Sequence, residues 1–337
     1  HASIALISGN NEIEEMYAYD GLQKFPKLVE TYLYLYEEMM PQMMQQLCPY
    51  IPYVPSSPSS CGHFVDPRNE NYGDSHYWAV WHDNKPYTEY RSHYFRYLSE
   101  FGFQSFPSEK TLNAVIEEED RNIFSRVMEM HQRNGVANGK ILNYLSQTYK
   151  YPREFGTLLY ASQLLQAEAM RYGVEHLRRH RGRCMGALYW QLNDIWGGTS
   201  WASIDYFGRY KALQYAAKRF FAPVLLSCQE NGLVQHKGNI NAQKGTYKEE
   251  CSYKLCVTND TRNEFSGLVV ATVRDAQGNV LASSERCVKV PALSVMWSQE
   301  QPFDFDPYTA HLQYVLIADD CAVSQGCALF APPKHYA

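Results

Sequence analysis

Two glutamates stand just behind apolar runs that predict buried strands. Glu100 ends the strand-like part of Tyr97-Leu98-Ser99-Glu100-Phe101-Gly102, and Glu12 closes the polar cluster Ser8-Gly9-Asn10-Asn11-Glu12. A β/α barrel carries its chemistry at the carboxyl ends of its strands. A single glutamate in such a place is most often an ordinary exposed loop residue. Two facing carboxylates, however, can hydrolyse a glycosidic bond, with one donating a proton and the other attacking the anomeric carbon.

Strand and helix patterns alternate from residue 3 to about residue 221, which predicts a parallel sheet covered by helices. The carboxyl ends of parallel strands meet on one face. Two strand candidates lie between the tips that carry Glu12 and Glu100, so in a closed ring of eight strands the two tips would face each other. The expected strands are 3–7, 50–54, 76–81, 94–99 and 184–190, and the expected helical stretches are 27–47, 109–133, 153–181 and 210–221.

The pattern changes after Pro223 to short alternating runs separated by turn residues. This pattern is typical of an immunoglobulin-like β-sandwich. The sequence therefore predicts an α/β domain over 1–222 and an all-β domain over 223–337. The expected strands of the second domain are 224–228, 253–257, 268–273, 280–290, 293–297 and 312–317.

Composition narrows the possible functions. With 337 residues, 45% of them hydrophobic, the chain can bury a large core and form two domains. The net charge is −5 and charges are scattered, so the sequence lacks the basic patch that a nucleic-acid partner requires. No apolar run reaches the ~20 residues of a membrane span. The 27 tyrosines serve either core packing or contact with a polyhydroxylated ligand.

The nine cysteines are dispersed, and none forms a CxxC pair. Zinc-ribbon spacing is therefore absent, and reduced thiols in a cytoplasmic setting are expected. The spacings of His, Cys and Asp provide no template for a metal site. Two-carboxylate chemistry needs only water, so no cofactor is expected. The oligomeric state stays open.

Five collinear stretches carry a family resemblance. The chain resembles a β-mannosidase of glycoside hydrolase family 2, whose (β/α)8 barrel has its acid/base after strand 4 and its nucleophile after strand 7. The resemblance implies strands 4–8 of that barrel followed by the sandwich, as in an internal segment of a longer enzyme. The stretches are Ser8–Glu15, Gly73–Trp78, Ser99–Pro107, Gly186–Trp196 and Lys218–Pro223.

The resemblance assigns roles by position. Glu12 corresponds to the acid/base, Glu100 to the nucleophile, and Asn11 to the residue that hydrogen-bonds the sugar 2-hydroxyl. Trp190 corresponds to the aromatic floor under the sugar, with barrel core as the alternative. Two further roles stay open: either Tyr77 or Trp78 faces the sugar, and His76 either holds a hydroxyl or caps its strand.

The implied activity is removal of terminal β-D-mannose from the non-reducing end of β-mannosides with retention of configuration. Another activity of the same family, β-galactosidase or β-glucuronidase, is the first alternative. A carbohydrate-binding or structural segment without turnover is the second.

Overall fold

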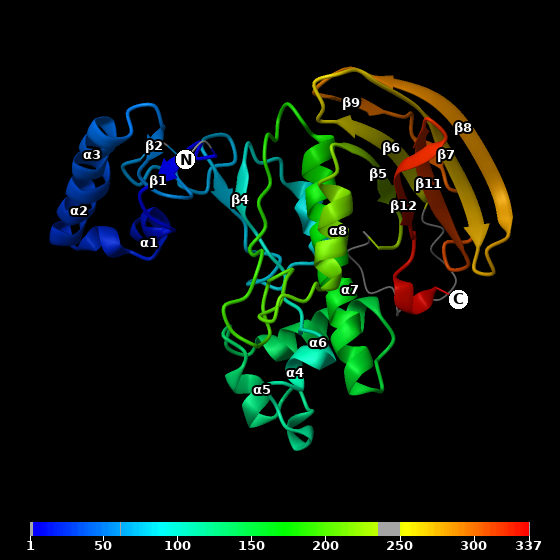
Figure 1. The fold of residues 1–337 in the computed structure, drawn as a ribbon, viewed down its shortest axis with the longest axis horizontal. Helices are drawn as coiled ribbons and strands as arrows, with labels where there is room; N and C mark the ends of the chain where they lie inside the picture. The colour runs from blue at the N-terminus through cyan, green and yellow to red at the C-terminus, as the bar shows by residue number, and fades with distance from the viewer. Residues whose placement is uncertain (1–2, 61, 235–249, 337) are drawn as a thin grey trace. The chain divides into compact units, whose positions relative to one another are not determined.

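The computed structural model describes residues 3–60, 62–234 and 250–336. These residues form two compact units, each considered by itself (Figure 1). Unit 1 comprises His1–Ala79, His93–Phe101 and Arg183–Tyr189. Unit 2 comprises Val80–Ser92, Gly102–Gly182 and Trp190–Ala337.

Unit 1 contains two pairs of short parallel strands. Strand β1 (Ile7–Ser8) pairs with β2 (Tyr53–Val54), and β3 (Ser75–His76) pairs with β4 (Leu98–Glu100). A further parallel bridge joins Leu98 to Ala187. The parallel pairing agrees with the alternating strand and helix pattern, while closure into part of an eight-stranded barrel stays a prediction.

The strands of unit 1 are much shorter than their apolar runs suggest. The first expected strand, residues 3–7, includes Ile4 and Leu6, which are 47% and 53% exposed, and pairing starts only at Ile7. The expected strand 76–81 ends at His76, and 184–190 provides a single bridge instead of a strand. An apolar run indicates that side chains are buried, but a strand also needs a neighbouring strand in register for backbone pairing. The apolar runs therefore overestimated the strand lengths.

A helical stretch follows β1 as predicted. Helix α1 (Ile13–Tyr19) and a 3-10 turn (Leu22–Lys24) lead into α2 (Pro26–Tyr32), a π-helical segment (Leu33–Met39) and α3 (Met40–Leu47). The π segment ends just before Pro41, which has no N–H to donate to an α-helical ladder. The expected helix over 27–47 is therefore confirmed, with a change of helical register in its middle.

Helices dominate the first part of unit 2. The longest is α7 (Phe155–Arg179), and α8 (Ala212–Phe220) follows it in the chain. These two helices confirm the expected helical stretches 153–181 and 210–221. The expected helical stretch 109–133 is instead broken into short pieces, and Glu118–Asp120 forms a 3-10 turn. The remaining helices are the 3-10 segment Tyr87–Ser92, α4 (Glu109–Leu112), α5 (Arg126–Met130) and α6 (Ala137–Thr148).

The predicted β-sandwich is present in unit 2, beside α7 and α8 (Figure 1). One sheet has the order β10-β6-β5 with β9 also paired to β6, and the other has the order β12-β11-β7-β8. All six expected strands are confirmed, and the sequence pattern missed two others, β10 and β12. The strands are β5 (Val224–Asn231), β6 (Ser252–Asn259), β7 (Phe265–Asp275), β8 (Val280–Val290), β9 (Ser294–Trp297), β10 (Gln301–Pro302), β11 (Ala310–Ala318) and β12 (Cys321–Ala328).

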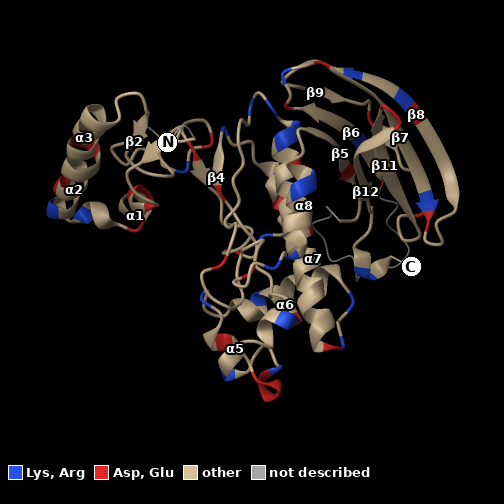
Figure 2. Cartoon of the chain, in the orientation of Figure 1, with Lys and Arg blue, Asp and Glu red and all other residues tan. Residues whose placement is uncertain are grey.

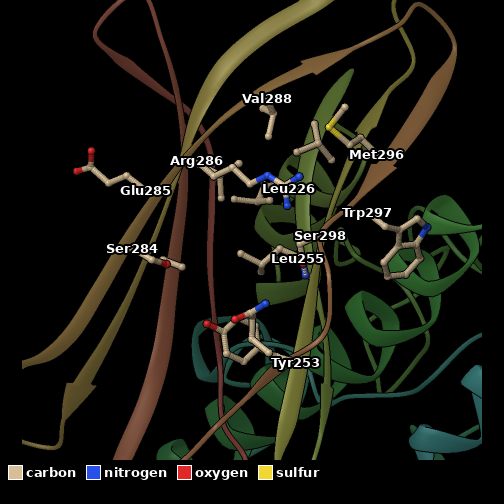
Figure 3. Close-up of a pocket in the computed structure, with 14 residues that line it drawn as sticks. Leu226, Tyr253, Leu255, Ser284, Glu285, Arg286, Val288, Met296, Trp297 and Ser298 are labelled. Carbon is tan, nitrogen blue, oxygen red and sulfur yellow. Dashed lines mark hydrogen bonds between the residues drawn. The ribbon is translucent and has the colours of Figure 1, made fainter.

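The sandwich contains an apolar core and a pocket. Leu226, Val257 and Leu312 are among its buried core residues. The pocket has a volume of about 250 Å³ and is lined only by sandwich residues (Figure 3). Val288 extends into it, whereas Glu285 points away.

Charged residues of both signs are interleaved along the ribbon (Figure 2). Among the described residues, no helix combines the length and apolarity that crossing a bilayer would require.

Candidate active site

Glu12 is held in place by its backbone. Its N–H donates to the carbonyl of Ser57 at 2.8 Å, and it precedes α1 with φ at +61°. A side chain with a Cβ is rarely found in this left-handed region, and such strain of about 1–3 kcal/mol is concentrated at functional sites. Asn10 supports the turn: its Oδ1 accepts from the N–H of Ile13, and its Nδ2 donates to the carbonyl of Pro55.

Glu100 is the last residue of β4, and strand pairing sets its neighbour. In the β3–β4 register His76 lies opposite Glu100, and the carbonyl of Glu100 accepts the N–H of Tyr77 at 2.8 Å. The strand register therefore places the His76 ring beside the Glu100 carboxylate.

His76 bridges the two carboxylates. Its Nδ1 lies 2.7 Å from Oε1 of Glu12 and 3.7 Å from Oε2 of Glu100. The His76 side chain is only 2% exposed, compared with 30% for Glu12 and 14% for Glu100. The ring faces both acidic groups. The two roles expected from the sequence, holding a sugar hydroxyl and capping the strand, stay predictions.

A carboxylate oxygen of Glu12 and one of Glu100 lie within 4.8 Å of each other. Retaining glycosidases hold their carboxyl groups ~5–5.5 Å apart, whereas inverting ones need ~6.5–9.5 Å to admit a water molecule. The separation is therefore close to the spacing that suits direct attack by one carboxylate.

Trp78 and Tyr77 have different surroundings. The Nε1–H of Trp78 donates to Oε1 of Glu100 at 3.2 Å. The Tyr77 ring packs against His93 at 4.3 Å and Phe95 at 5.4 Å between ring centroids. Of the two aromatic candidates, the structure brings Trp78 to the carboxylate.

Burial raises the pKa of Glu100 above its ordinary value, which is the largest effect on this group. The charge of His76 and the hydrogen bond from Trp78 act in the opposite direction, while the negative charge of Glu12 adds to the rise. The hydrogen bond from the Trp78 indole and a positive charge on the imidazole thus both favour the ionised form of Glu100.

The remaining predicted site residues are Asn11 and Trp190. Asn11 is exposed and forms a parallel backbone bridge with Ser57. Trp190 belongs to unit 2, where it is 46% exposed, and the peptide bond to Gln191 is cis. Both expected roles of Trp190, the sugar floor and the barrel core, stay predictions.

Sequence reasoning missed a group of polar residues behind His76. Nε2 of His76 lies 3.0 Å from Oγ of Ser57, and that hydroxyl donates to Oδ2 of Asp74 at 2.6 Å. Asp74 also accepts from Oγ of Ser99 at 2.6 Å and from the N–H of Ser59 at 3.0 Å. The available signal was an Asp two residues before His76 in the stretch Gly73–Trp78.

The same cluster has the donor atoms of a cation site. Glu12, His76 and Glu100 each offer one ligand atom, and these atoms lie within 4.8 Å of one another. Two carboxylate oxygens and one imidazole nitrogen suit a small divalent ion. The arrangement thus has two chemical uses, acid–nucleophile catalysis and cation binding.

Comparison with known proteins shows which proteins the chain resembles. Residues 251–335 match the family described as Mannosidase Ig/CBM-like domain. The chain is 35% identical over 287 residues to β-mannosidase B of Aspergillus flavus, covering 80% of this chain and 33% of that protein. It is 32% identical over 249 residues to β-mannosidase of Rattus norvegicus, covering 67% of this chain and 28% of that protein.

Solved structures agree. The crystal structure of β-D-mannosidase from Dictyoglomus thermophilum matches 99% of this chain and 39% of its own, with a TM-score of 0.86 and 27% identity. The chain is a homologue of the β-mannosidases. The predicted resemblance is thereby confirmed, and these homologues are glycoside hydrolases. An exo-chitosanase from Amycolatopsis orientalis, with a TM-score of 0.62 and 16% identity over 86% of this chain, shares the fold.

The chain spans about a third of the length of the curated β-mannosidases that it matches. The match to β-mannosidases includes the stretch with Glu12, His76 and Glu100, because the structural similarity covers nearly the whole chain.

Proposed function

We propose that this chain supplies the acid/base and the nucleophile of a retaining exo-β-mannosidase. The observation that carries the proposal is the approach of the Glu12 and Glu100 carboxylates to within 4.8 Å in a homologue of β-mannosidases. The substrate would be a β-mannoside with a terminal, non-reducing mannose.

The first chemical step forms a mannosyl ester. Glu12 in its carboxylic acid form donates its proton to the glycosidic oxygen, and a Glu100 oxygen attacks the anomeric carbon while the bond to the leaving group breaks. Trp78 donates a hydrogen bond to Glu100 and orients the attacking carboxylate. Asn11 would hold the 2-hydroxyl, and Trp190 would form the floor below the ring.

The second step returns the enzyme to its starting state. Glu12, now ionised, takes a proton from water, the water oxygen attacks the anomeric carbon, and the ester bond to Glu100 breaks. Two inversions at one carbon give net retention. No electron transfer is involved. The proton that Glu12 donates leaves with the released alcohol, one proton of the water replaces it on Glu12, and the remaining O–H of the water becomes the anomeric hydroxyl of mannose.

The fold belongs to the same proposal. We place residues 1–222 in the C-terminal part of a (β/α)8 barrel, with strands 4–8, and residues 223–337 in the following immunoglobulin-like domain. The short parallel strands of unit 1 and the sandwich of unit 2 support this division. The cytoplasmic setting stays a prediction.

The test uses the intact polypeptide with p-nitrophenyl β-mannoside. Turnover should fall by at least about 10³-fold in Glu100→Gln, because a covalent nucleophile is removed. A 2-fluoro mannosyl fluoride should label Glu100, as read by peptide mass spectrometry. Labelling of another residue would refute the assignment. Turnover of the β-galactoside or β-glucuronide in place of the mannoside would favour the related activities.

Cation binding by Glu12, His76 and Glu100 is the second candidate, because their ligand atoms lie within 4.8 Å. A chelator distinguishes the two. Activity that survives exhaustive EDTA treatment supports the carboxylate mechanism, and activity lost to EDTA and restored by a divalent ion supports the cation. Sugar binding with no turnover under either condition would favour the carbohydrate-binding alternative.

A further inference from the structure

We infer that Ser57 and Asp74 are positioning residues that fix the tautomer of His76 and thereby hold the catalytic proton on Glu12. The inference rests on the proposed function and extends it to two side chains that lie behind His76. Its basis is an unbroken row of hydrogen bonds, Asp74–Ser57–His76–Glu12.

Asp74 anchors the row. Its Oδ2 accepts from the hydroxyls of Ser57 and Ser99, each at 2.6 Å, and its Oδ1 accepts from the backbone N–H of Ser59 at 3.0 Å. An ionised carboxylate has only acceptor sites, so both hydroxyl protons point at it. The position of Asp74 is thus set from three sides.

The direction of the row follows from proton counting. A hydroxyl has one proton, and Ser57 uses it toward Asp74, so the Ser57 oxygen can only accept from the imidazole. Nε2 of His76 must therefore carry a proton. In a neutral ring this leaves the lone pair on Nδ1, the atom that lies 2.7 Å from Oε1 of Glu12.

The consequence falls on Glu12. An unprotonated Nδ1 of His76 accepts a hydrogen bond, so it stabilises Glu12 in the form that carries a proton on Oε1. One proton then lies between Nδ1 of His76 and Oε1 of Glu12. That is the proton which a general acid must deliver to the leaving group. A ring with a proton on Nδ1, as in the other neutral tautomer or in the imidazolium, would instead stabilise the ionised form of Glu12, the state that follows proton donation.

Ser99 provides a matched control. Like Ser57, it donates to Oδ2 of Asp74 at 2.6 Å, but its second contact is the carbonyl of Ser75 instead of the imidazole. Ser99→Ala removes one support of Asp74 and leaves the contact between Ser57 and His76. Ser57→Thr keeps the hydroxyl and should restore what Ser57→Ala removes.

The first measurement does not depend on activity. Long-range ¹H–¹⁵N spectra of the histidine-labelled protein, assigned with His76→Asn, should show a protected proton on Nε2 of His76. This proton should lose its protection in Ser57→Ala and keep it in Ser99→Ala. An Nε2 without a proton in the wild type would overturn the inference, whatever the protein hydrolyses.

The second measurement varies the leaving group. Ser57→Ala should lower kcat/KM about 10- to 100-fold for an alkyl β-mannoside, part of the ~10²–10⁴ that a general acid contributes. The loss should be within about threefold for the 2,4-dinitrophenyl glycoside, which departs without a proton. Ser99→Ala should stay within about twofold on both substrates.

The outcomes are distinct. An equal loss on both substrates would mean that Ser57 acts only on the structure of the site and would overturn the positioning role. A wild-type protein that cleaves neither glycoside would refute the proposed function, while the spectra would still decide whether the hydrogen-bond row exists.

Discussion

At the scale of single residues, the site is a histidine between two carboxylates. His76 is almost completely buried, and its Nδ1 faces both Glu12 and Glu100. Each group changes the charge state that its neighbours prefer. The pH dependence of activity therefore tests the contacts among His76, Glu12 and Glu100.

The first prediction concerns the acidic limb of the pH profile. Burial raises the pKa of Glu100, so the ionised form of this proposed nucleophile should be lost on acidification at a pH above the ordinary 4.5. Trp78 lowers that pKa through its hydrogen bond. Trp78→Phe should therefore shift the midpoint of kcat/KM to higher pH.

The matching control is Tyr77→Phe, because Tyr77 packs against His93 and Phe95. Its acidic midpoint should coincide with that of the wild type. A midpoint in Trp78→Phe that is unchanged or lower would contradict the role of the indole N–H.

The second prediction concerns stability. A carboxyl with a raised pKa in the folded state favours the protonated form, so its ionisation destabilises the fold above the ordinary value of 4.5. Glu100→Gln should accordingly raise the free energy of unfolding at pH 7, and the gain should vanish below about pH 4. Urea titrations at both pH values measure it, and a gain of equal size at both would contradict the electrostatic cause.

The sequence predicted both carboxylates and their proximity, because strand tips and family motifs mark them. It did not predict that His76 bridges them or that Asp74 and Ser57 stand behind it. Those contacts depend on side chains from segments that come together only in the folded chain. The hydrophobic periodicity of the sequence therefore does not predict them.

At the scale of elements, unit 2 ties its helical part to the sandwich with buried ion pairs. Arg91, in the 3-10 segment Tyr87–Ser92, donates from Nη2 to Oε2 of Glu230 in β5 at 2.8 Å, and from Nη1 to the Glu230 carbonyl at 2.7 Å. The Arg91 and Glu230 side chains are 11% and 5% exposed. The Arg91 guanidinium also lies 3.8 Å from the centre of the Tyr172 ring in α7.

The third prediction is that Arg91→Met destabilises the protein by about 3–5 kcal/mol, because it removes the guanidinium that donates to the buried Glu230 carboxylate. The double variant Arg91→Met/Glu230→Gln should recover part of that loss, since no charge stays unpaired. Chemical denaturation of the wild type, both single variants and the double variant gives the coupling energy. Additive losses would show that the pair contributes nothing beyond its packing.

Long or strongly alternating elements were predicted well, as the helix α7 and the strand β8 show. The short strands of unit 1 were overestimated, because β1, β2 and β3 pair over only two residues each. Strand β12 was missed because its sequence, Cys321–Ala328, contains small and polar residues that alternate weakly.

At the scale of the whole molecule, the observed units differ from the division between residues 222 and 223 that the sequence suggests. Unit 2 joins the helical stretch Gly102–Gly182 to the sandwich. Arg178 donates to Oδ2 of Asp260 at 2.7 Å, and Arg179, which is fully buried, donates to the carbonyl of Cys228 at 3.0 Å. Sequence patterns detect the change in secondary structure and carry no record of these long-range contacts.

The fourth prediction follows from this joint unit. A polypeptide that stops at residue 222 should lose cooperative unfolding, because Arg91 and Arg179 keep their positive charges without the sandwich groups that accept their hydrogen bonds. Circular dichroism during heating and limited proteolysis measure the effect. A cooperative transition like that of the 337-residue chain would show that the helical part folds without the sandwich.

The left-handed backbone of Glu12 has a consequence for laboratory evolution. Glycine adopts a φ of +61° without steric cost, whereas glutamate does not. In a library of variants exposed only to heat, glycine should therefore accumulate at position 12. In a library that must consume a β-mannoside to grow, glutamate should persist there. Deep sequencing of the two populations measures the residue frequencies at position 12. Selection for thermal stability should enrich glycine there, and selection for turnover should keep glutamate.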